Sequence, residues 1–373
     1  SNAGYICPSH FIPLAAPGIV RSGLRWMLDA SSPLYIKPSL NSDFLKWAWA
    51  FNKSATSSHV QKNAIHLRDF TEFSQQLFQS IKYDEQFSFH YDKKGLLMLC
   101  QTERQLEKEL EILTMANSLS VHAKEISKAE LKILEPSVEI NGVGGVYFEN
   151  DHHSTPSDFM NQLKAYLRSK GVRIFSNESV VDFMMKQGKI DSVITDKQIL
   201  RSDEFVMASG SWSADLCKKL GLKLMLQAGK GYSMNTKVST GITTPTILAE
   251  AKIAVTPMDG FTRFAGTMEI AGVNQTINRK RVEGIAKAAN HYYPSIQLSE
   301  PEIEAATCGL RPLSPDGLPY IGKPQSCENM TIATGHAMLG WTLGPGTGKL
   351  VSELILNKIT SLDIDIYHPN RKF

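Results

Sequence analysis

The spacing of hydrophobic residues predicts several amphipathic helices. Between residues 63 and 81, Leu67, Phe70, Phe73 and Leu77 recur at intervals of three and four, which places them on one face of a helix. Similar patterns predict helices over residues 21–28, 43–53, 102–117, 127–135, 156–170, 213–220, 279–292 and 345–357. The apolar faces of these helices are expected to lie in the core.

Short apolar runs between glycine or polar turns predict strands. They cover residues 87–91, 96–100, 143–148, 172–175, 179–185, 189–195, 198–200, 204–210, 246–256, 260–266, 303–311 and 330–334. Because only Asp92–Gly95 separates the first two runs, we predict that they pair as a hairpin. Strands and helices together are typical of a mixed α/β fold.

Length and composition limit the classes of protein to which the chain can belong. At 373 residues the chain is long enough for two joined domains with a substantial core. A net charge of +3 is too small to indicate nucleic-acid binding. The five cysteines are scattered without a C-x-x-C pair, so we expect free thiols in a reducing compartment. No apolar run is long enough to cross a bilayer.

Residues 151–154 read Asp-His-His-Ser, a composition that suggests metal ligands. Adjacent side chains point in different directions, however, and no third ligand stands at a useful spacing in the sequence. We therefore expect a loop that leads into the helix over residues 156–170, and no metal site.

Residues 330–357 combine a predicted strand, a loop with glycines at 335, 340, 344 and 346, and a helix that begins near Pro345. This order brings backbone N–H groups and a helix N-terminus close to an anionic or electron-rich ligand. A turn that merely needs glycine is the alternative, and the residues just upstream favour the ligand.

Residues 308–322 read C-G-L-R-P-L-S-P-D-G-L-P-Y-I-G, and residues 335–342 read G-H-A-M-L-G-W-T. Together they resemble the C-terminal half of the FAD-dependent amine and amino-acid oxidoreductases of the D-amino acid oxidase type, most closely the bacterial D-amino acid dehydrogenases. Residues 263–269, R-F-A-G-T-M-E, are similar to the family's R-x-x-G-T-x-E.

The resemblance implies an α/β (α+β) fold in which two domains interleave. A Rossmann-like FAD-binding domain would comprise residues 1–40, 140–225 and 300–373. A substrate domain built on an antiparallel sheet would comprise residues 41–139 and 226–299.

The expected G-x-G-x-x-G turn is absent from the sequence, and the glycines of residues 141–146 precede no helix. Ser1–Ala3 is typical of a cleaved expression tag, although Asn2–Gly4 also fits a motif that follows the family's first βαβ unit. We therefore expect an incomplete FAD-binding domain that lacks roughly one such unit. A protein that folds without holding FAD, and serves only in binding or assembly, is the alternative function.

In this family an amine is oxidised to an imine by hydride transfer to flavin N5, and water hydrolyses the imine to a 2-oxo acid and ammonia. The resemblance implies that Arg311 holds the substrate carboxylate, because a guanidinium matches a carboxylate with two hydrogen bonds; an ion pair between domains is the alternative. It implies Tyr232 as a second contact and His336 as a group that lines the pocket.

The residues that the resemblance implies at the cofactor are Gly4, Val181, Ala208, Gly210, Lys230, Gly231, Gly309, Gly335, His336, Leu339, Gly340, Trp341 and Thr342.

The expected substrate is a small D-amino acid. Glycine or sarcosine oxidase and D-hydroxyproline dehydrogenase share these motifs and stay open as alternatives. Dehydrogenases of this type are usually peripheral to the inner membrane and pass electrons to a quinone. The resemblance therefore implies a cytoplasmic enzyme that can associate with that membrane, with a quinone or another electron acceptor as partner and no nucleic acid.

Overall fold

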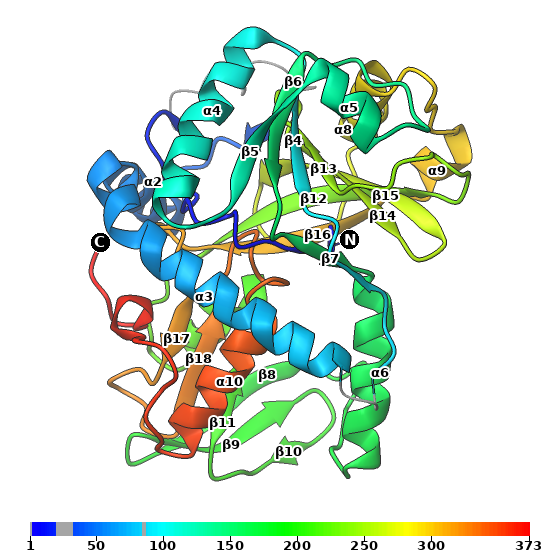
Figure 1. The fold of residues 1–373 in the computed structure, drawn as a ribbon. Coiled ribbons are helices and arrows are strands. Elements are labelled where there is room, and N and C mark those ends of the chain that lie inside the picture. The colour runs from blue at the N-terminus through cyan, green and yellow to red at the C-terminus, as the bar shows by residue number, and fades with distance from the viewer. Residues whose placement is uncertain (1, 20–32, 84–86) are drawn as a thin grey trace.

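A computed structural model describes residues 2–19, 33–83 and 87–373. The chain has two halves, with a large sheet in one and smaller sheets with long helices in the other (Figure 1). The helix predicted over residues 21–28 lies outside the described residues. None of the described helices is long and apolar enough to cross a membrane.

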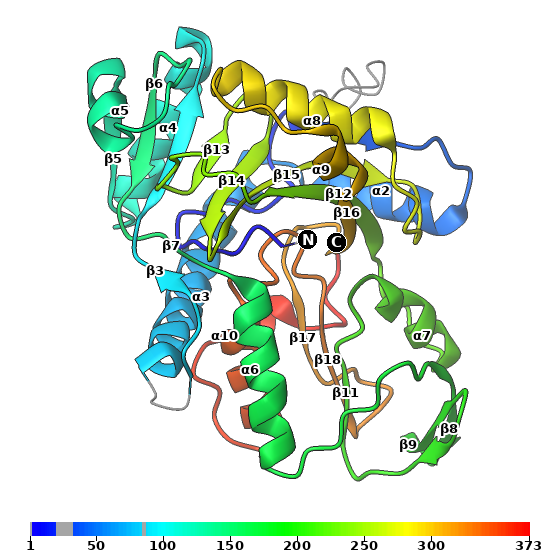
Figure 2. The same ribbon diagram turned by 90° about the vertical axis from the view of Figure 1, so that its right-hand side faces the viewer.

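The first half is a nine-stranded sheet in which β2 pairs with β15 beside the main path. In spatial order its strands are β16 (Thr307–Leu313), β12 (Gln227–Thr236), β15 (Phe261–Ile270), β14 (Ile253–Met258), β13 (Thr246–Leu248), β4 (Leu96–Cys100), β6 (Gly144–Phe148) and β5 (Ala123–Ser127), with β2 at Leu34–Ile36. Helix α8 (Arg279–Tyr292) lies across one face of the sheet (Figure 2). Val282, Ile285 and Ala289 of α8 pack there against Phe264, in one buried cluster.

The second half contains two three-stranded sheets. In one, β18 (Met330–Thr334) lies between β11 (Phe205–Met207), which is parallel to it, and β17 (Tyr320–Gly322), which is antiparallel. The other is built from β8 (Val180–Lys186), β9 (Lys189–Thr195) and β10 (Ile199–Leu200). A further small sheet joins β1 (Tyr5–Ile6), β7 (His152–Ser154) and β3 (Tyr91–Asp92).

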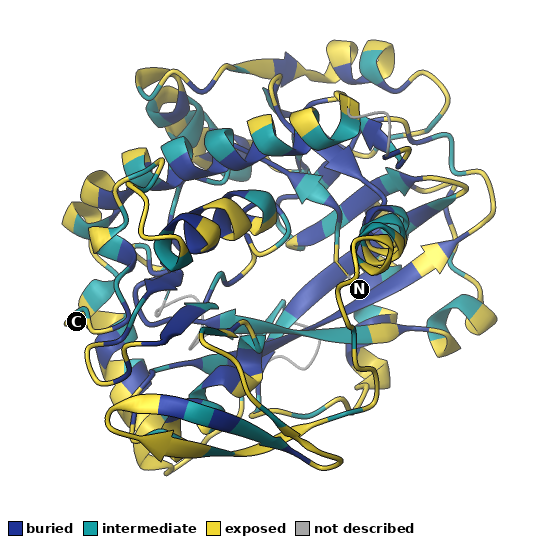
Figure 3. Cartoon of the chain, turned by 90° about the horizontal axis from the view of Figure 1, so that it is seen from below, coloured by how far each residue is buried: buried dark blue, intermediate teal, exposed yellow. Residues whose placement is uncertain are grey.

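The remaining helices surround these sheets. They are α2 (Ser42–Ser54), α3 (Ser57–Tyr83), α4 (Glu103–Ser118), α5 (Lys128–Leu134), α6 (Pro156–Ser169), α7 (Ser213–Lys219), α9 (Glu300–Glu304) and α10 (Gly344–Ile355), with 3₁₀ turns at Gly210–Trp212 and Asp365–Tyr367. Buried residues gather along the sheets and the inner helix faces, whereas the outer helix faces are exposed (Figure 3). This is the arrangement that the helical spacing of apolar residues predicts.

Most predicted elements are present, but the predicted hairpin over residues 87–100 is wrong. Strand β3 pairs with β7, whereas β4 pairs with β6 and β13 in the large sheet. Phe89 packs in a cluster with Ile6, Phe78 and Phe159, while Leu97 lies in the core of the large sheet. Burial against two different cores therefore separates the two strands.

Three smaller predictions are also corrected. Residues 172–175 form no strand. Residues 152–154 form β7 rather than a loop, because β1 and β3 pair with them on both sides. The strand expected from residue 303 begins at Thr307, after the short helix α9, whose capping box joins Ser299 and Glu302.

The predicted domain boundaries cross the large sheet. The prediction places residues 140–225 and 300–373 in the cofactor domain, yet β6 and β16, which lie in those ranges, belong to the nine-stranded sheet. The division into a cofactor domain and a substrate domain otherwise stays a prediction.

The Pro315–Gly317 turn is fixed from the other end of the chain. Both oxygens of the Asp316 carboxylate accept hydrogen bonds from Arg371, at 2.7 Å from Nε and 2.9 Å from Nη2. Arg371 also donates to the carbonyls of Leu318 and Pro319. The side chains of the pair are only 10% and 8% exposed, so water does not replace these bonds if one partner is removed.

Replacement of Arg371 by Ala is expected to lower the free energy of unfolding by about 3–5 kcal/mol, because it leaves a buried carboxylate without its partner. Urea denaturation followed by circular dichroism measures this change. Arg201→Ala is the control, because Arg201 pairs with Asp191 at an exposed site and should cost less than about 1 kcal/mol. Equal losses of unfolding free energy in the two variants would contradict a stabilising role for the buried Arg371–Asp316 pair.

Candidate functional site

A cavity of about 810 Å³ opens beside the large sheet, between β12, β15 and β16, the N-terminal residues, α2 and the loop that follows β18. Its lining is mainly apolar. The apolar side chains include Leu14, Leu34, Phe44, Trp47, Phe51, Met268, Ile270, Leu313, Met338 and Leu339. None of the described lining residues is acidic, whereas Arg311 and Lys252 are basic. The cavity therefore suits a largely apolar ligand with an anionic group.

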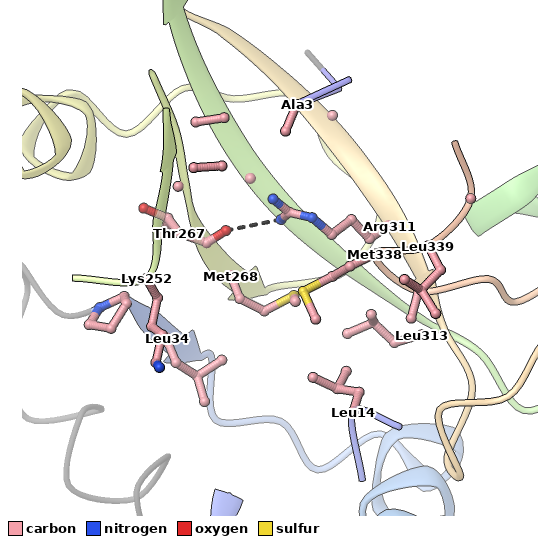
Figure 4. Close-up of a pocket in the computed structure, with 18 of the residues that line it drawn as sticks. Ala3, Leu14, Leu34, Lys252, Thr267, Met268, Arg311, Leu313, Met338 and Leu339 are labelled. Carbon is pink, nitrogen blue, oxygen red and sulfur yellow. Dashed lines mark hydrogen bonds between the residues drawn. The ribbon is translucent and has the colours of Figure 1, made fainter. Parts of the chain in front are cut away.

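Arg311 extends across strand β12 and points into the cavity (Figure 4). Its guanidinium lies over Gly231, where a Cβ atom would be 2.2 Å from Nη1. Nη1 donates a hydrogen bond to the carbonyl of Thr267 at 2.9 Å. No carboxylate among the described residues forms an ion pair with it. Burial lowers the pKa of Arg311 to about 10, so the side chain is still a cation at neutral pH.

A β-bulge makes the Thr267 carbonyl available to Arg311. Opposite β12, Lys230 pairs with Glu269 and Tyr232 with Gly266, so Thr267 and Met268 together face Gly231 alone. Thr267 has a φ of +71°, the left-handed conformation that is common at such irregularities. Its carbonyl therefore points away from the hydrogen-bond ladder between the strands and accepts a hydrogen bond from the Arg311 guanidinium.

The loop after β18 forms another wall. Leu339 N–H and Leu343 N–H donate within the loop, to His336 and Leu339. The N–H groups of Gly340, Trp341 and Thr342, which line the cavity, donate to no described residue. Three neighbouring backbone donors at an apolar cavity form a site for carbonyl oxygens or an anion.

The side chains of this loop connect it to the N-terminal strand. Thr342 Oγ1 donates to the carbonyl of Tyr5 at 2.9 Å, and Trp341 Nε1 donates to Ser154 Oγ at 3.0 Å. The Trp341 ring packs against Phe78 and Phe159. The free N–H groups are therefore held in a fixed position by β1, β7, α3 and α6.

The sequence predicts that the N-terminus of α10 and the amides of Gly340 to Thr342 face the ligand together, and the structure separates these two groups of donors. Gly346 N–H donates to Ser74 Oγ of α3, and a Cβ at Gly346 would lie 2.8 Å from the Phe70 ring. The first turn of α10 thus packs against α3. The donors at the cavity are those of the preceding loop, the predicted amides of Gly340 to Thr342.

Of the residues predicted from the sequence, the cavity brings together Arg311, Gly231, Gly309, Leu339, Gly340, Trp341 and Thr342. Gly309 lies opposite Gly231 in the register of β12 and β16. The motifs therefore located one wall and the central cation of the cavity.

The structure places Tyr232 and Lys230 on the other face of β12, away from the cavity. The Tyr232 hydroxyl donates to Glu269 Oε2 at 2.9 Å, and Lys230 Nζ donates to Asn274 Oδ1 and the Thr276 carbonyl. Lys230 Nζ also lies 3.1 Å from Glu269 Oε1. These groups form a buried polar network toward α8 and do not line the cavity.

His336 lies behind the cavity wall rather than in it. Its Nε2 is 2.9 Å from Thr347 Oγ1 of α10, and burial lowers its pKa to about 4. It is therefore neutral at physiological pH and joins the loop to α10. The prediction that it lines the pocket is not supported by this position.

The other predicted cofactor residues do not line the described part of the cavity. Gly4 and Gly335 have φ values of +77° and +80°; a Cβ at Gly4 would meet the Ser154 carbonyl, and one at Gly335 the Tyr320 ring. Ala208 and Gly210 follow β11, where Thr334 Oγ1 of the parallel strand β18 donates to the Gly210 carbonyl. Ligands of parallel sheets bind beyond such carboxyl ends. Val181 lies exposed in β8, and its role stays a prediction.

A polar cluster adjoins the cavity at the N-terminal segment, and sequence reasoning missed it. Ser9 donates both its N–H and its hydroxyl to the Asp151 carboxylate, and His10 Nδ1 is 3.1 Å from Ser9 Oγ. Burial raises the pKa of Asp151 to about 7 and lowers that of His10 to about 4. Cys7 and His10 line the cavity, but about 140 residues separate them from Asp151, so no local spacing indicated the cluster.

Sequence reasoning also missed Thr267 and Trp47 as site residues. Thr267 stands inside the R-x-x-G-T-x-E motif, which offered a signal. Trp47 lines the cavity and donates its indole N–H to the Leu313 carbonyl at 2.9 Å, and only its place on the apolar face of α2 could have indicated it.

Comparisons with known proteins show the family of the chain. The family model described as DAO, FAD dependent oxidoreductase, matches residues 15–354. The chain is 31% identical over 364 residues to a D-amino acid dehydrogenase of Vibrio vulnificus strain CMCP6, covering 95% of this chain and 86% of the relative.

Solved structures share the fold. A glycine oxidase from Geobacillus kaustophilus superposes with a TM-score of 0.74 at 23% identity, over 82% of this chain and 84% of the other. An L-proline dehydrogenase from P. horikoshii does so with a TM-score of 0.71 at 19% identity, over 81% and 82% of the two chains. The protein is thus an oxidoreductase of the FAD-dependent DAO family.

Proposed function

We propose that this enzyme oxidises the amine of a small D-amino acid to an imine, which water hydrolyses to a 2-oxo acid and ammonia. The observation that carries the proposal is the position of Arg311, a cation with no carboxylate partner among the described residues, in an apolar cavity beside a row of free N–H groups.

The chain offers groups that fit FAD, the cofactor of its family. The free N–H groups of Gly340, Trp341 and Thr342 suit the electron-rich carbonyl edge of a flavin, and the apolar walls suit its ring. These donors would also stabilise negative charge that develops there. When bound, FAD supplies the chemistry of hydride acceptance from the substrate's α-carbon.

Arg311 binds and orients the substrate in this proposal. Its guanidinium is fixed by Gly231 and by the Thr267 carbonyl, so it presents its remaining N–H groups to a carboxylate without first being ordered. The apolar side chains around it exclude water, which strengthens the charge-assisted hydrogen bonds. A fixed carboxylate in turn restricts where the α-carbon can lie.

The choice of a D-amino acid is supported by the relative from Vibrio vulnificus, which is named D-amino acid dehydrogenase. The solved structures of a glycine oxidase and an L-proline dehydrogenase are under 25% identical and bear only on the fold. Initial rates with D-alanine, D-proline, L-alanine and glycine, measured with an electron-accepting dye, distinguish these substrates. A preference for L-alanine or glycine would overturn the proposal.

Replacement of Arg311 by Met is expected to raise KM for the D-amino acid about 10- to 150-fold, because a hydrogen bond to a charged group contributes about 1.5–3 kcal/mol. The KM of Arg311→Lys should lie between those of the unaltered enzyme and Arg311→Met. Lysine keeps the positive charge but cannot donate two parallel hydrogen bonds to a carboxylate. Steady-state kinetics measures both variants. Ethylamine, which has no carboxylate, should be a poor substrate whose rate neither change lowers further.

Lys252→Met is the matched control, because Lys252 is a second cation that lines the cavity but is exposed. Its KM should stay close to that of the unaltered enzyme. A large rise in KM for Lys252→Met, with none for Arg311→Met, would move the carboxylate site to Lys252.

Replacement of Gly231 by Ala is expected to raise KM nearly as much as loss of Arg311, because the new methyl group would displace the guanidinium from its seat. Gly348→Ala, where a Cβ meets nothing within 4 Å, controls for adding a methyl group. Kinetics and circular dichroism should show a folded Gly231→Ala protein with impaired substrate binding. Unchanged KM would contradict the role of Gly231.

Replacement of His336 by Gln is expected to change kcat by less than about tenfold, because a neutral His336 paired with Thr347 positions the loop and exchanges no proton with the substrate. Removal of a general base typically costs about 10²- to 10⁴-fold. The profile of kcat against pH from 6 to 9 should keep its shape. A decrease in kcat of that size, or the loss of a pH-dependent step from the profile, would indicate that His336 accepts a proton from the substrate.

A further inference from the structure

The His153 side chain is buried with too few hydrogen-bond partners. It is 1% exposed, and neither ring nitrogen makes a hydrogen bond of normal geometry to a described residue. The Pro257 carbonyl lies close enough to interact with one ring nitrogen, which leaves the other nitrogen without a partner among the described residues. Its neighbour His152 points to the other side of the strand, where its Nδ1 lies 2.6 Å from the Tyr91 hydroxyl. A buried polar group left unpaired loses its hydrogen bonds to water without replacement, so the position of His153 needs an explanation.

Two potential metal ligands face His153 from strand β3 and the residue before it. Asp92 is the direct partner of His153 in the pairing of β3 with β7. His90 Nε2 lies 3.4 Å from Asp92 Oδ2, and the rings of His90 and His153 meet edge to face. One ligand atom from each of the three residues lies within 4.8 Å of the others.

These spacings suit one small cation. Two ligands that each stand about 2.0–2.2 Å from a tetrahedral zinc ion are about 3.3–3.6 Å apart. The His90–Asp92 pair already has this separation. A His153 ring nitrogen lies within 4.8 Å of both partners, so the third ligand stands beside the pair.

The surroundings orient His90 as a ligand. Its Nδ1 is 2.9 Å from Thr155 Oγ1, which also accepts the N–H of Asp259 at 2.9 Å. If Nδ1 carries the proton and donates it to Thr155, Nε2 directs its lone pair toward Asp92. Metal-binding histidines are usually held in this way through the other ring nitrogen.

We propose that His90, Asp92 and His153 bind a divalent transition metal, with Zn²⁺ as the best fit. Two imidazoles and one carboxylate favour such an ion over Mg²⁺ or Ca²⁺, which prefer oxygen ligands. The carboxylate side chain is 47% exposed, so water completes the coordination. The sequence predicted no metal at residues 151–154, because adjacent histidines point in different directions and no third ligand stands at a useful spacing. In the structure the two other ligands come from about 60 residues upstream.

The site lies outside the cavity but next to one of its supports. Ser154, which follows His153, accepts the indole N–H of Trp341, and Thr155 is the N-cap residue of α6. A bound ion would join β3 to β7 at this place and stabilise the protein in proportion to its binding.

A second group of potential ligands has to be separated from this site. Cys7, His10 and Asp151 also lie close together, but Ser9 already donates two hydrogen bonds to Asp151 and contacts His10. That group already forms hydrogen bonds with protein atoms, so the unpaired ring nitrogen of His153 favours the first site.

The test is titration of the FAD-loaded, tag-free chain with Zn²⁺ by calorimetry, with Co²⁺ absorption as a probe of the ligands. One ion should bind per chain and raise the thermal midpoint. His153→Gln and Asp92→Asn should weaken binding at least about 100-fold, and Thr155→Val about 10- to 100-fold. Asp92 is partly exposed, so Asp92→Asn gives an answer even if His153→Gln fails to fold.

His152→Gln is the matched control, because it alters the adjacent histidine on the opposite face and should leave binding unchanged. His10→Gln should also leave it unchanged. The proposal is overturned if the unaltered chain binds no Zn²⁺, if Asp92→Asn binds it equally well, or if only His10→Gln abolishes binding.

Discussion

The contact between the Arg311 guanidinium and the bare backbone of Gly231 is the constraint on which the candidate site depends. Any side chain at position 231 would occupy the place of the guanidinium, and the bulge in β15 supplies the carbonyl that orients it. A cation is thereby held in an apolar cavity, without an ion-pair partner among the described residues. Its desolvation is best offset by an anionic ligand, which makes a substrate carboxylate the natural complement.

The second wall of the cavity is the loop before α10, whose backbone N–H groups have no partner among the described residues. Helix α10 directs its first turn to Ser74 of α3, while the loop before it keeps three N–H groups free. Trp341 and Thr342 fasten this loop to β7 and β1 through their side chains. The large sheet thus supplies the cation and the smaller half supplies the backbone donors, so the cavity requires both halves to be folded together.

The sequence motifs predicted Arg311, Gly231 and the loop at residues 339–342 because these depend on local turns and on a family pattern. They also included Lys230 and Tyr232, which strand alternation places on the face opposite to Gly231, so the described cavity does not include these two side chains. The bulge at Thr267 and the polar cluster around Asp151 could not be predicted, since both arise from partners far apart in the chain. The same holds for β3 and β4, which separate because each finds a different distant strand.

The most direct test of the account is the visible spectrum of the FAD-loaded chain during anaerobic addition of D-alanine and, separately, L-alanine. We expect FAD to bind, and its absorbance near the flavin maximum to be bleached by D-alanine but not by L-alanine. A chain that takes up no FAD, or a bound flavin that stays oxidised with every D-amino acid supplied, would contradict it.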